Sequence, residues 1–158
     1  IMNKIILLFF GLIILSLPTY AQKQFAYQVE CISVENNGSV TIKIWNTKKG
    51  KRYSQQQARK DAVHSILYSG VPGNNGCVAQ KPLLSTPKSI EAFKKIENDF
   101  FSKNGEWSKY SREASVPTTL PQQIGDKKWK VYQVSISKDL LRKYLEEQKI
   151  IKSLNSGF

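Results

Sequence analysis

The feature that most constrains this fold is a helix whose apolar face begins with methyl groups. Ala58, Ala62 and Ile66 recur every fourth residue, with Val63 and Leu67 beside them. Side chains at this spacing lie on one face of a helix. Because alanine side chains are small, we expect this face to lie very close to a sheet.

The sequence indicates where this helix begins and where it ends. Ser54, followed three residues later by Gln57, predicts an N-terminal capping box. At the other end, Gly70 followed by Pro72 predicts a left-handed stop. The glycine-rich loop at residues 70–76 lacks the Gly-Lys-Ser/Thr pattern of a phosphate-binding loop, so we interpret it as a structured turn that carries Cys77 over the sheet.

The first 21 residues have the three parts of a secretory signal peptide. Lys4 supplies positive charge, residues 5–17 form an apolar run, and Thr19 and Ala21 suit cleavage after Ala21. The run is shorter than the roughly 20 apolar residues of a membrane span. We therefore expect residues 22–158 to form a single periplasmic or secreted domain, without a transmembrane span after cleavage. Lipid attachment is not expected, because the mature chain does not begin with cysteine.

The chain carries a formal charge of +12 at pH 7, from 24 Lys and Arg against 12 Asp and Glu. An excess of this size favours anionic partners such as lipid head groups, acidic polysaccharide or nucleic acid. Export makes nucleic acid the least favoured of the three. The alternative interpretation is that the lysines only keep the domain soluble.

Two short stretches concentrate this charge. Their members are Lys48, Lys49, Lys51 and Arg52 in the first stretch and Lys127, Lys128, Trp129 and Lys130 in the second. Lysines around a tryptophan occur at membrane surfaces and on platforms that bind glycans or nucleic acid. The alternatives are a solvated loop for the first stretch and an edge strand protected by lysines for the second.

Two cysteines in an exported chain suggest a disulfide, because the compartment is oxidising. A bond between Cys31 and Cys77 would close a loop of about 46 residues and stabilise the fold by about 4 kcal/mol through loop entropy. The alternative, equally weighted, is that Cys31 is a buried apolar thiol and Cys77 a loop residue.

Apolar and polar residues alternate at residues 25–35 and 39–45, which predicts two strands. Asn37-Gly38 between them is a dipeptide suited to a type I′ turn. Pairing across that turn predicts Ile44 opposite Cys31. The residues then expected on the inner face are Val29, Cys31, Ile42 and Ile44.

The remaining segments complete an α+β plan. We expect a helix from Thr86 to residue 104 with a stripe of phenylalanines, a weak strand at residues 107–116, a loop at 117–126, a strand at 127–137 and a helix capped by Ser137. The order is ββααββα. It predicts an antiparallel sheet of about four strands with helices packed on one face.

No stretch carries a catalytic or metal-binding signature. His64 lies about 200° around its helix from Ala62, so we expect it to be exposed. A thiol-protease pair of Cys77 with His64 has no local support. There is no Cys-x-x-Cys, no second histidine and no Gly-x-Ser-x-Gly, so we expect no cofactor, no metal and no enzymatic activity.

The helix sequence ARKDAVHSIL after a hairpin, with KWKVYQVSISKDLLRKYL later in the chain, resembles a known exported domain. That domain is shared by the twenty-kilodalton outer-membrane lipoprotein family and the N-terminal part of the flagellar ring protein FlgT. The resemblance covers residues 52–145 and implies an envelope accessory without enzymatic chemistry. The chain differs in lacking a lipid-bearing cysteine and the additional domains of FlgT. The resemblance identifies no functional residues.

Two functions follow as hypotheses. The first is a non-enzymatic accessory or interaction domain that contacts a cell-envelope protein assembly. The second is a basic domain that binds anionic surface glycan or lipid through the two charged stretches.

Overall fold

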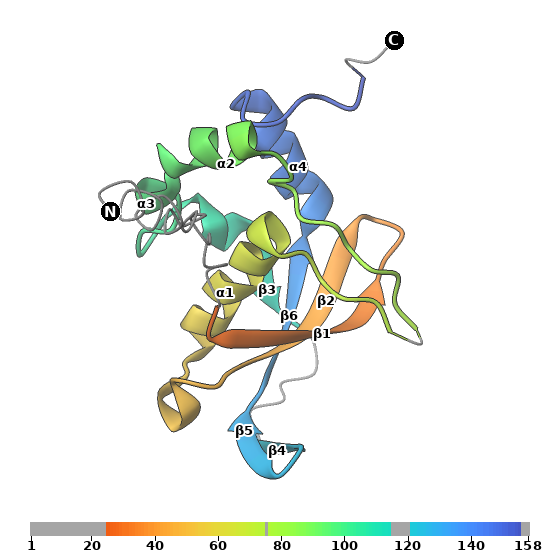
Figure 1. The fold of residues 1–158 in the computed structure, drawn as a ribbon, viewed down its shortest axis with the longest axis vertical. Coiled ribbons are helices and arrows are strands. Elements are labelled where there is room, and N and C mark those ends of the chain that lie inside the picture. Colours follow the sequence, from red (N-terminus) through yellow and green to blue (C-terminus); the bar gives the residue numbers. More distant parts are fainter. Residues whose placement is uncertain (1–24, 75, 115–120, 156–158) are drawn as a thin grey trace, which may run out of the picture.

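The computed structural model describes residues 25–74, 76–114 and 121–155. The expected signal peptide and its cleavage position lie outside these residues. The elements, in chain order, are β1 (Tyr27–Val34), β2 (Ser39–Asn46), η3 (Gly50–Arg52), α1 (Gln55–Tyr68), α2 (Pro87–Lys94), α3 (Glu97–Phe100), η4 (Glu106–Lys109), β3 (Ser111–Glu113), β4 (Pro121–Ile124), β5 (Lys127–Lys130), β6 (Tyr132–Ser137) and α4 (Lys138–Glu147) (Figure 1).

Four strands form an antiparallel sheet in the order β1-β2-β6-β3, and β4 and β5 form a second, two-stranded sheet. The predicted α+β class with a four-stranded sheet is therefore confirmed. One buried cluster joins the inner face of the large sheet to side chains from α1, α2, α3 and α4. In the described residues, no helix has the length and apolar content needed to cross a membrane.

Helix α1 packs on the sheet through the predicted methyl face. Ala58, Ala62 and Ile66 are fully buried, and the helix contacts all four strands of the large sheet. Alanine permits this because its side chain adds little bulk between the helix axis and the strands. The helix therefore packs across the whole width of the large sheet.

The ends of α1 follow the prediction with one difference. Ser54 caps the helix by accepting a 3.2 Å hydrogen bond from the Gln57 amide. The reciprocal half of a capping box is absent, because the Gln57 side chain instead donates to Asp61 Oδ1 at 2.7 Å. Gly70 ends the helix in the left-handed region, with φ 71°.

The β1–β2 turn corrects the predicted hairpin register. Gly38 alone has a positive φ, 77°, and its amide donates to the Glu35 carbonyl at 3.0 Å, while the Glu35 amide donates to the Ser39 carbonyl at 2.9 Å. This is a three-residue loop instead of a type I′ turn. Further along, a bulge at Ile32 shifts the pairing again, so that Ile44 faces Val29 and not Cys31.

The residues predicted on the inner face of the hairpin lie there in spite of the corrected register. The longer loop and the bulge each shift the pairing by one residue, and two such shifts restore the side-chain alternation of a strand. Cys31, Ile42 and Ile44 are accordingly buried, and Val29 packs against them.

The helix predicted from Thr86 is broken into α2 and α3. Its start is as expected, since the Thr86 and Ser89 side chains each accept the other's backbone amide at 3.1 Å. The break lies at Lys95 and Ile96. In an unbroken helix Phe93 and Phe100 would be about 10 Å apart along the axis, whereas here their ring centroids are 5.2 Å apart.

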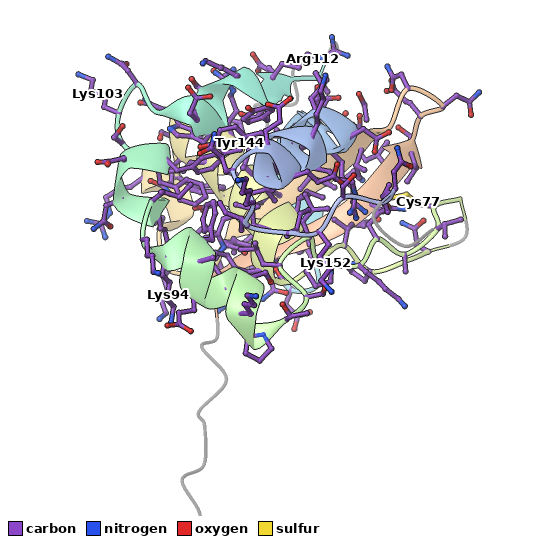
Figure 2. The ribbon with its side chains drawn as sticks, turned by 90° about the horizontal axis from the view of Figure 1, so that it is seen from above. Cys77, Lys94, Lys103, Arg112, Tyr144 and Lys152 are labelled. Carbon is purple, nitrogen blue, oxygen red and sulfur yellow. A yellow bond between two sulfur atoms is a disulfide. The ribbon has the colours of Figure 1, made fainter. Side chains whose placement is uncertain are left out.

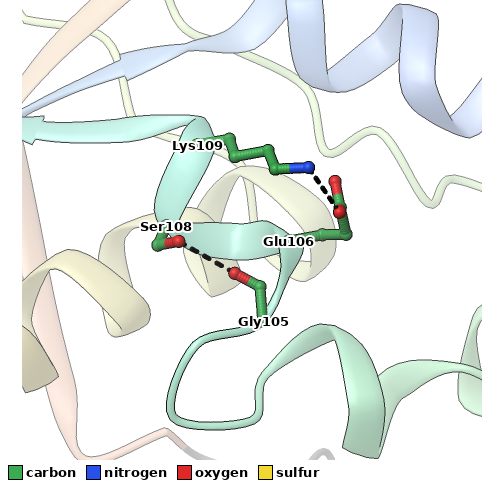
Figure 3. Close-up of polar contacts among 4 residues, drawn as sticks. All are labelled: Gly105, Glu106, Ser108 and Lys109. Carbon is green, nitrogen blue, oxygen red and sulfur yellow. Dashed lines mark hydrogen bonds and ion pairs between the residues drawn. The ribbon is translucent and has the colours of Figure 1, made fainter.

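The weak strand predicted at residues 107–116 is wrong for most of residues 107–114, and residues 115 and 116 lie outside the described part of the chain. Residues Glu106–Lys109 form the 3-10 turn η4, and only Ser111–Glu113 pair as β3. Local polar contacts stabilise the turn, because Ser108 Oγ donates to the Gly105 carbonyl at 2.9 Å and Lys109 lies 2.6 Å from Glu106 (Figure 3). Trp107 is thereby turned into the core.

The loop predicted at residues 117–126 and the single strand predicted at 127–137 are also corrected. Residues 117–120 lie outside the described part, but Pro121–Ile124 form β4 and pair with β5. The long strand is interrupted at Val131, which is buried between β5 and β6. The interruption lets β5 leave the large sheet and form its own hairpin.

Candidate functional site

The first basic stretch is a tight turn built on the last residue of β2. Asn46 Oδ1 accepts hydrogen bonds from the amides of Lys48 and Lys49, at 3.0 and 2.9 Å. Residues Gly50–Arg52 then form η3, with Gly50 at φ 50°. This backbone arrangement leaves the four cationic side chains of the stretch on the surface.

The second basic stretch is strand β5 of the small hairpin. Ile124 pairs with Lys127 across a turn in which Gly125 has φ 58°. Lys127 and Lys128 are exposed, whereas Trp129 and Lys130 are half-buried. The exposed lysines agree with both interpretations of this stretch, a strand protected by lysines and an anion-binding surface.

The fold brings these two stretches together. Strand β5 contacts both η3 and β2, although about 75 residues of chain separate the basic stretches. Figure 1 shows the β4–β5 hairpin at the bottom of the molecule and the η3 turn beside it at the lower left. We call this surface the basic end; its members are Lys48, Lys49, Lys51, Arg52, Lys127, Lys128, Trp129 and Lys130.

A buried tyrosine anchors the basic end to the core. Tyr53, directly after η3, is fully buried and donates a 3.0 Å hydrogen bond to Asp61 Oδ2. Its carbonyl accepts a 2.9 Å hydrogen bond from the Tyr132 hydroxyl. Lys130 Nζ lies 5.6 Å from the Tyr132 ring centroid, a cation–π distance. The turn and the hairpin are thus attached to the same pair of tyrosines.

Few acids offset the charge of the basic end. In residues 46–53 and 121–130 there are seven cations and one acid, Asp126. Among the described residues, the ion pairs join Lys109 to Glu106 and Arg142 to Glu146, away from this surface. Burial raises the pKa of Asp61, against the opposing effect of its hydrogen bonds and of Lys49. The basic end can therefore attract a surface that bears repeated negative charges.

The cysteines resolve one open alternative. Cys31 and Cys77 form a disulfide with Cα atoms 6.0 Å apart, and both residues are buried. A disulfide sulfur is not a thiolate, so Cys77 cannot act with His64 as a protease nucleophile in this state. The described residues contain no cluster of three histidine, cysteine or carboxylate side chains that could hold a metal ion.

The prediction that His64 is exposed is wrong. The residue is half-buried, and its Nδ1 lies 2.8 Å from the Tyr27 hydroxyl. Phe25 meets the imidazole edge to face with centroids 4.5 Å apart, and Tyr68 lies 4.6 Å away. Burial raises the pKa of Tyr27 to about 12. Phe25, which precedes β1, and Tyr27, its first residue, therefore cover a side of the helix that its own periodicity assigns to solvent.

Sequence reasoning missed a second group of cations. Lys81, Lys88, Arg142, Lys149 and Lys152 line one groove between the segment before α2 and the end of α4. Because these residues lie far apart along the chain, no local pattern connects them. Only packing of α4 beside residues 81–89 brings them together.

Comparisons with family models, with curated proteins and with solved structures find no match for this chain. The resemblance to the twenty-kilodalton outer-membrane lipoprotein family therefore stays a prediction.

Proposed function

We propose that this chain is a non-catalytic binding domain of an extracytoplasmic compartment that attaches to an anionic surface through the basic end. The observation that carries the proposal is the contact between η3 and β5, which joins two basic stretches into one surface. The Cys31–Cys77 disulfide supports the compartment, since disulfides persist in oxidising environments.

The chemistry of the basic end suits repeated phosphate or carboxylate groups. Six of its seven cations are lysines, which bind anions as mobile point charges and impose little geometry. Trp129, half-buried on β5, adds the amphipathic ring that favours a membrane interface. Anionic lipid head groups and acidic glycans share this chemistry, and they differ in whether an apolar layer lies beneath the charges.

Vesicle binding tests the proposal. We expect the protein to cosediment with phosphatidylglycerol vesicles and not with phosphatidylcholine vesicles, and to dissociate as salt is added. The double substitution Lys127→Glu with Lys128→Glu reverses two charges of the basic end. It should weaken binding by at least about tenfold, because each lysine near an anionic membrane contributes about 1 kcal/mol. Soluble acidic polysaccharide, used as a competitor, distinguishes a glycan ligand from a lipid ligand.

A matched control uses exposed lysines elsewhere on the surface. Lys94→Glu with Lys103→Glu makes the same change in net charge, at positions that Figure 2 shows on the helical side of the molecule. This control should retain binding. Equal loss in both double variants, or binding unchanged between low and high ionic strength, would remove the basis for the proposal.

A second candidate function is contact with a cell-envelope protein. The observation that favours it is the groove between α4 and the segment before α2, whose lining combines cations with aliphatic side chains. Such a lining offers a polypeptide segment both charge complementarity and apolar contact. Binding of labelled acidic peptides to that groove tests this candidate directly.

A further inference from the structure

A groove of about 670 Å³ opens on the side of α4, away from the basic end. One wall is formed by residues 81–86 and the first turn of α2, and the other by Arg142 and Glu146 of α4 with residues 149–153. In Figure 2, Lys152 lies between α4 and the chain that leads into α2. This volume falls within the range of ligand-binding sites in proteins.

The floor of the groove is apolar. Pro82, Leu83, Ile150 and Ile151 contribute to it. Leu83 and Ile150 are only 4% and 8% exposed, so most of their surface already packs in the core. The remaining exposed part of these side chains offers apolar contact to a side chain of a ligand.

Both walls carry positive charge. Lys81 and Lys88 come from one wall, and Arg142, Lys149 and Lys152 come from the other. The single acid in the lining is Glu146, whose Oε1 lies 3.9 Å from Arg142 Nη1. In the described residues the four lysines form no ion pair. The groove therefore presents, from both walls, lysines that no ion pair neutralises in the described residues.

Lys149 lines the groove in a backbone conformation that is unfavourable for a residue other than glycine. The Lys149 amide donates to the Glu146 carbonyl and the Ile150 amide to the Leu145 carbonyl, both at 2.9 Å, which is the Schellman arrangement at a helix end. Its φ of 56° makes it the one non-glycine residue in the left-handed region among those described. Glycine is the usual residue there, and lysine costs about 1 kcal/mol more. A lysine at this position keeps a charge on the groove wall.

We propose that this groove binds an acidic peptide segment of a partner protein, with one apolar side chain of the peptide inserted over Leu83 and Ile150. The proposal rests on the second candidate function, whose partner it specifies as an acidic peptide, and it does not involve the basic end. A peptide fits better than a single phosphate, because several carboxylates along an extended chain can reach lysines on both walls. It fits better than a bilayer surface, because these cations line two walls of a groove instead of one flat face.

Fluorescence anisotropy with labelled synthetic peptides tests the proposal on the disulfide-bonded protein. The probe is a peptide in which aspartates and glutamates flank a single leucine, and its control has serine in place of that leucine. We expect the leucine peptide to bind more tightly. Lys88→Glu with Lys152→Glu should weaken its binding by about tenfold or more, through loss of attraction from both walls.

Two further variants make the result specific. Lys127→Glu with Lys128→Glu changes the basic end by the same charge and should leave peptide binding within about twofold of the unmodified protein. Lys149→Gly removes one groove cation without adding an acid, and it should weaken binding while the melting temperature stays the same or rises. This second result separates loss of the groove from loss of folding.

Four outcomes would overturn the proposal: no saturable peptide binding, equal affinity for the leucine and serine peptides, equal loss in the basic-end variant, and unaltered affinity in the Lys88/Lys152 variant. Phosphatidylglycerol vesicles that bind through Lys88 and Lys152 while the peptide does not bind would identify a lipid site instead. Vesicle binding lost only in the Lys127/Lys128 variant concerns the basic end, so the two proposals can fail separately.

Discussion

Cys31 on β1 and Cys77 in the loop after α1 are joined by a disulfide that crosses from the sheet edge to the far end of that loop. A second contact reinforces it, because Asn74 Nδ2 donates a 2.6 Å hydrogen bond to the Cys31 carbonyl. The bond closes a segment of 46 residues that contains β2, η3 and α1. The segment that leads into the peptide groove is therefore tied to the sheet.

Removing the disulfide should destabilise the protein strongly. Cys31→Ala with Cys77→Ala should lower the free energy of unfolding by about 4 kcal/mol, the loop-entropy estimate for this length. Urea unfolding monitored by tryptophan fluorescence measures the change, with the reduced unmodified protein as a comparison. A loss below about 1 kcal/mol would show that the unfolded chain is not appreciably constrained by this bond.

Substitutions at two glycines distinguish the cost of a left-handed backbone conformation from the cost of a steric overlap. Gly50 and Gly70 both have positive φ, 50° and 71°, but a Cβ at Gly50 meets nothing within 4 Å, whereas one at Gly70 would lie 2.2 Å from the Gln80 carbonyl oxygen. Gly50→Ala should cost about 1 kcal/mol, the penalty of the left-handed conformation. Gly70→Ala should cost clearly more. Equal losses in thermal unfolding would contradict the close approach at Gly70.

Lys149→Gly should stabilise the protein while it weakens peptide binding. The left-handed conformation at the end of α4 favours glycine, so the free energy of unfolding should rise by about 1 kcal/mol. Chemical denaturation gives the value, and Lys143→Gly, within α4 at an exposed position, is the matched control that should destabilise the helix by about 1 kcal/mol. A loss of stability in Lys149→Gly would contradict the assigned helix end.

Asp61 should make stability depend on pH in a defined direction. Burial raises its pKa above the ordinary value of 3.8, so between that value and the raised pKa the folded state binds more protons than the unfolded state. Stability contributed by this group therefore falls as the pH rises through that window and is fully present below it. The difference in unfolding free energy between the unmodified protein and Asp61→Asn should decrease from about pH 3 to pH 7.

Urea titrations of both proteins at each pH measure this difference, in which the other titrating groups largely cancel. A difference that grows with pH would mean that the hydrogen bonds from Tyr53 and Gln57 outweigh burial at this carboxylate.

Several local features could be predicted because short-range chemistry specifies them. The buried face of α1, the stop at Gly70 and the cap at Thr86 each depend on residues within one or two helical turns. The strand pattern around Tyr132 was equally clear, since alternation over six residues identifies a half-buried strand. The basic stretches were identified individually for the same reason.

Other features depended on contacts between distant residues. The break between α2 and α3 lets Phe93 and Phe100 touch, and the cover over His64 comes from Phe25 and Tyr27, nearly 40 residues earlier in the chain. The single strand predicted at residues 127–137 divides because Val131 is drawn into the core. A pattern within one segment contains no information about such neighbours.

Periodicity and capping act within a few residues, so the order of residues alone specifies the α+β class, the face of α1 that meets the sheet and the two basic stretches. Long-range packing is responsible for three other features: Cys31 meets Cys77, η3 lies beside β5, and lysines from residues 81–88 and 149–152 share one groove. Proximity of residues far apart in a chain follows from how its elements pack, and packing depends on all the side chains together.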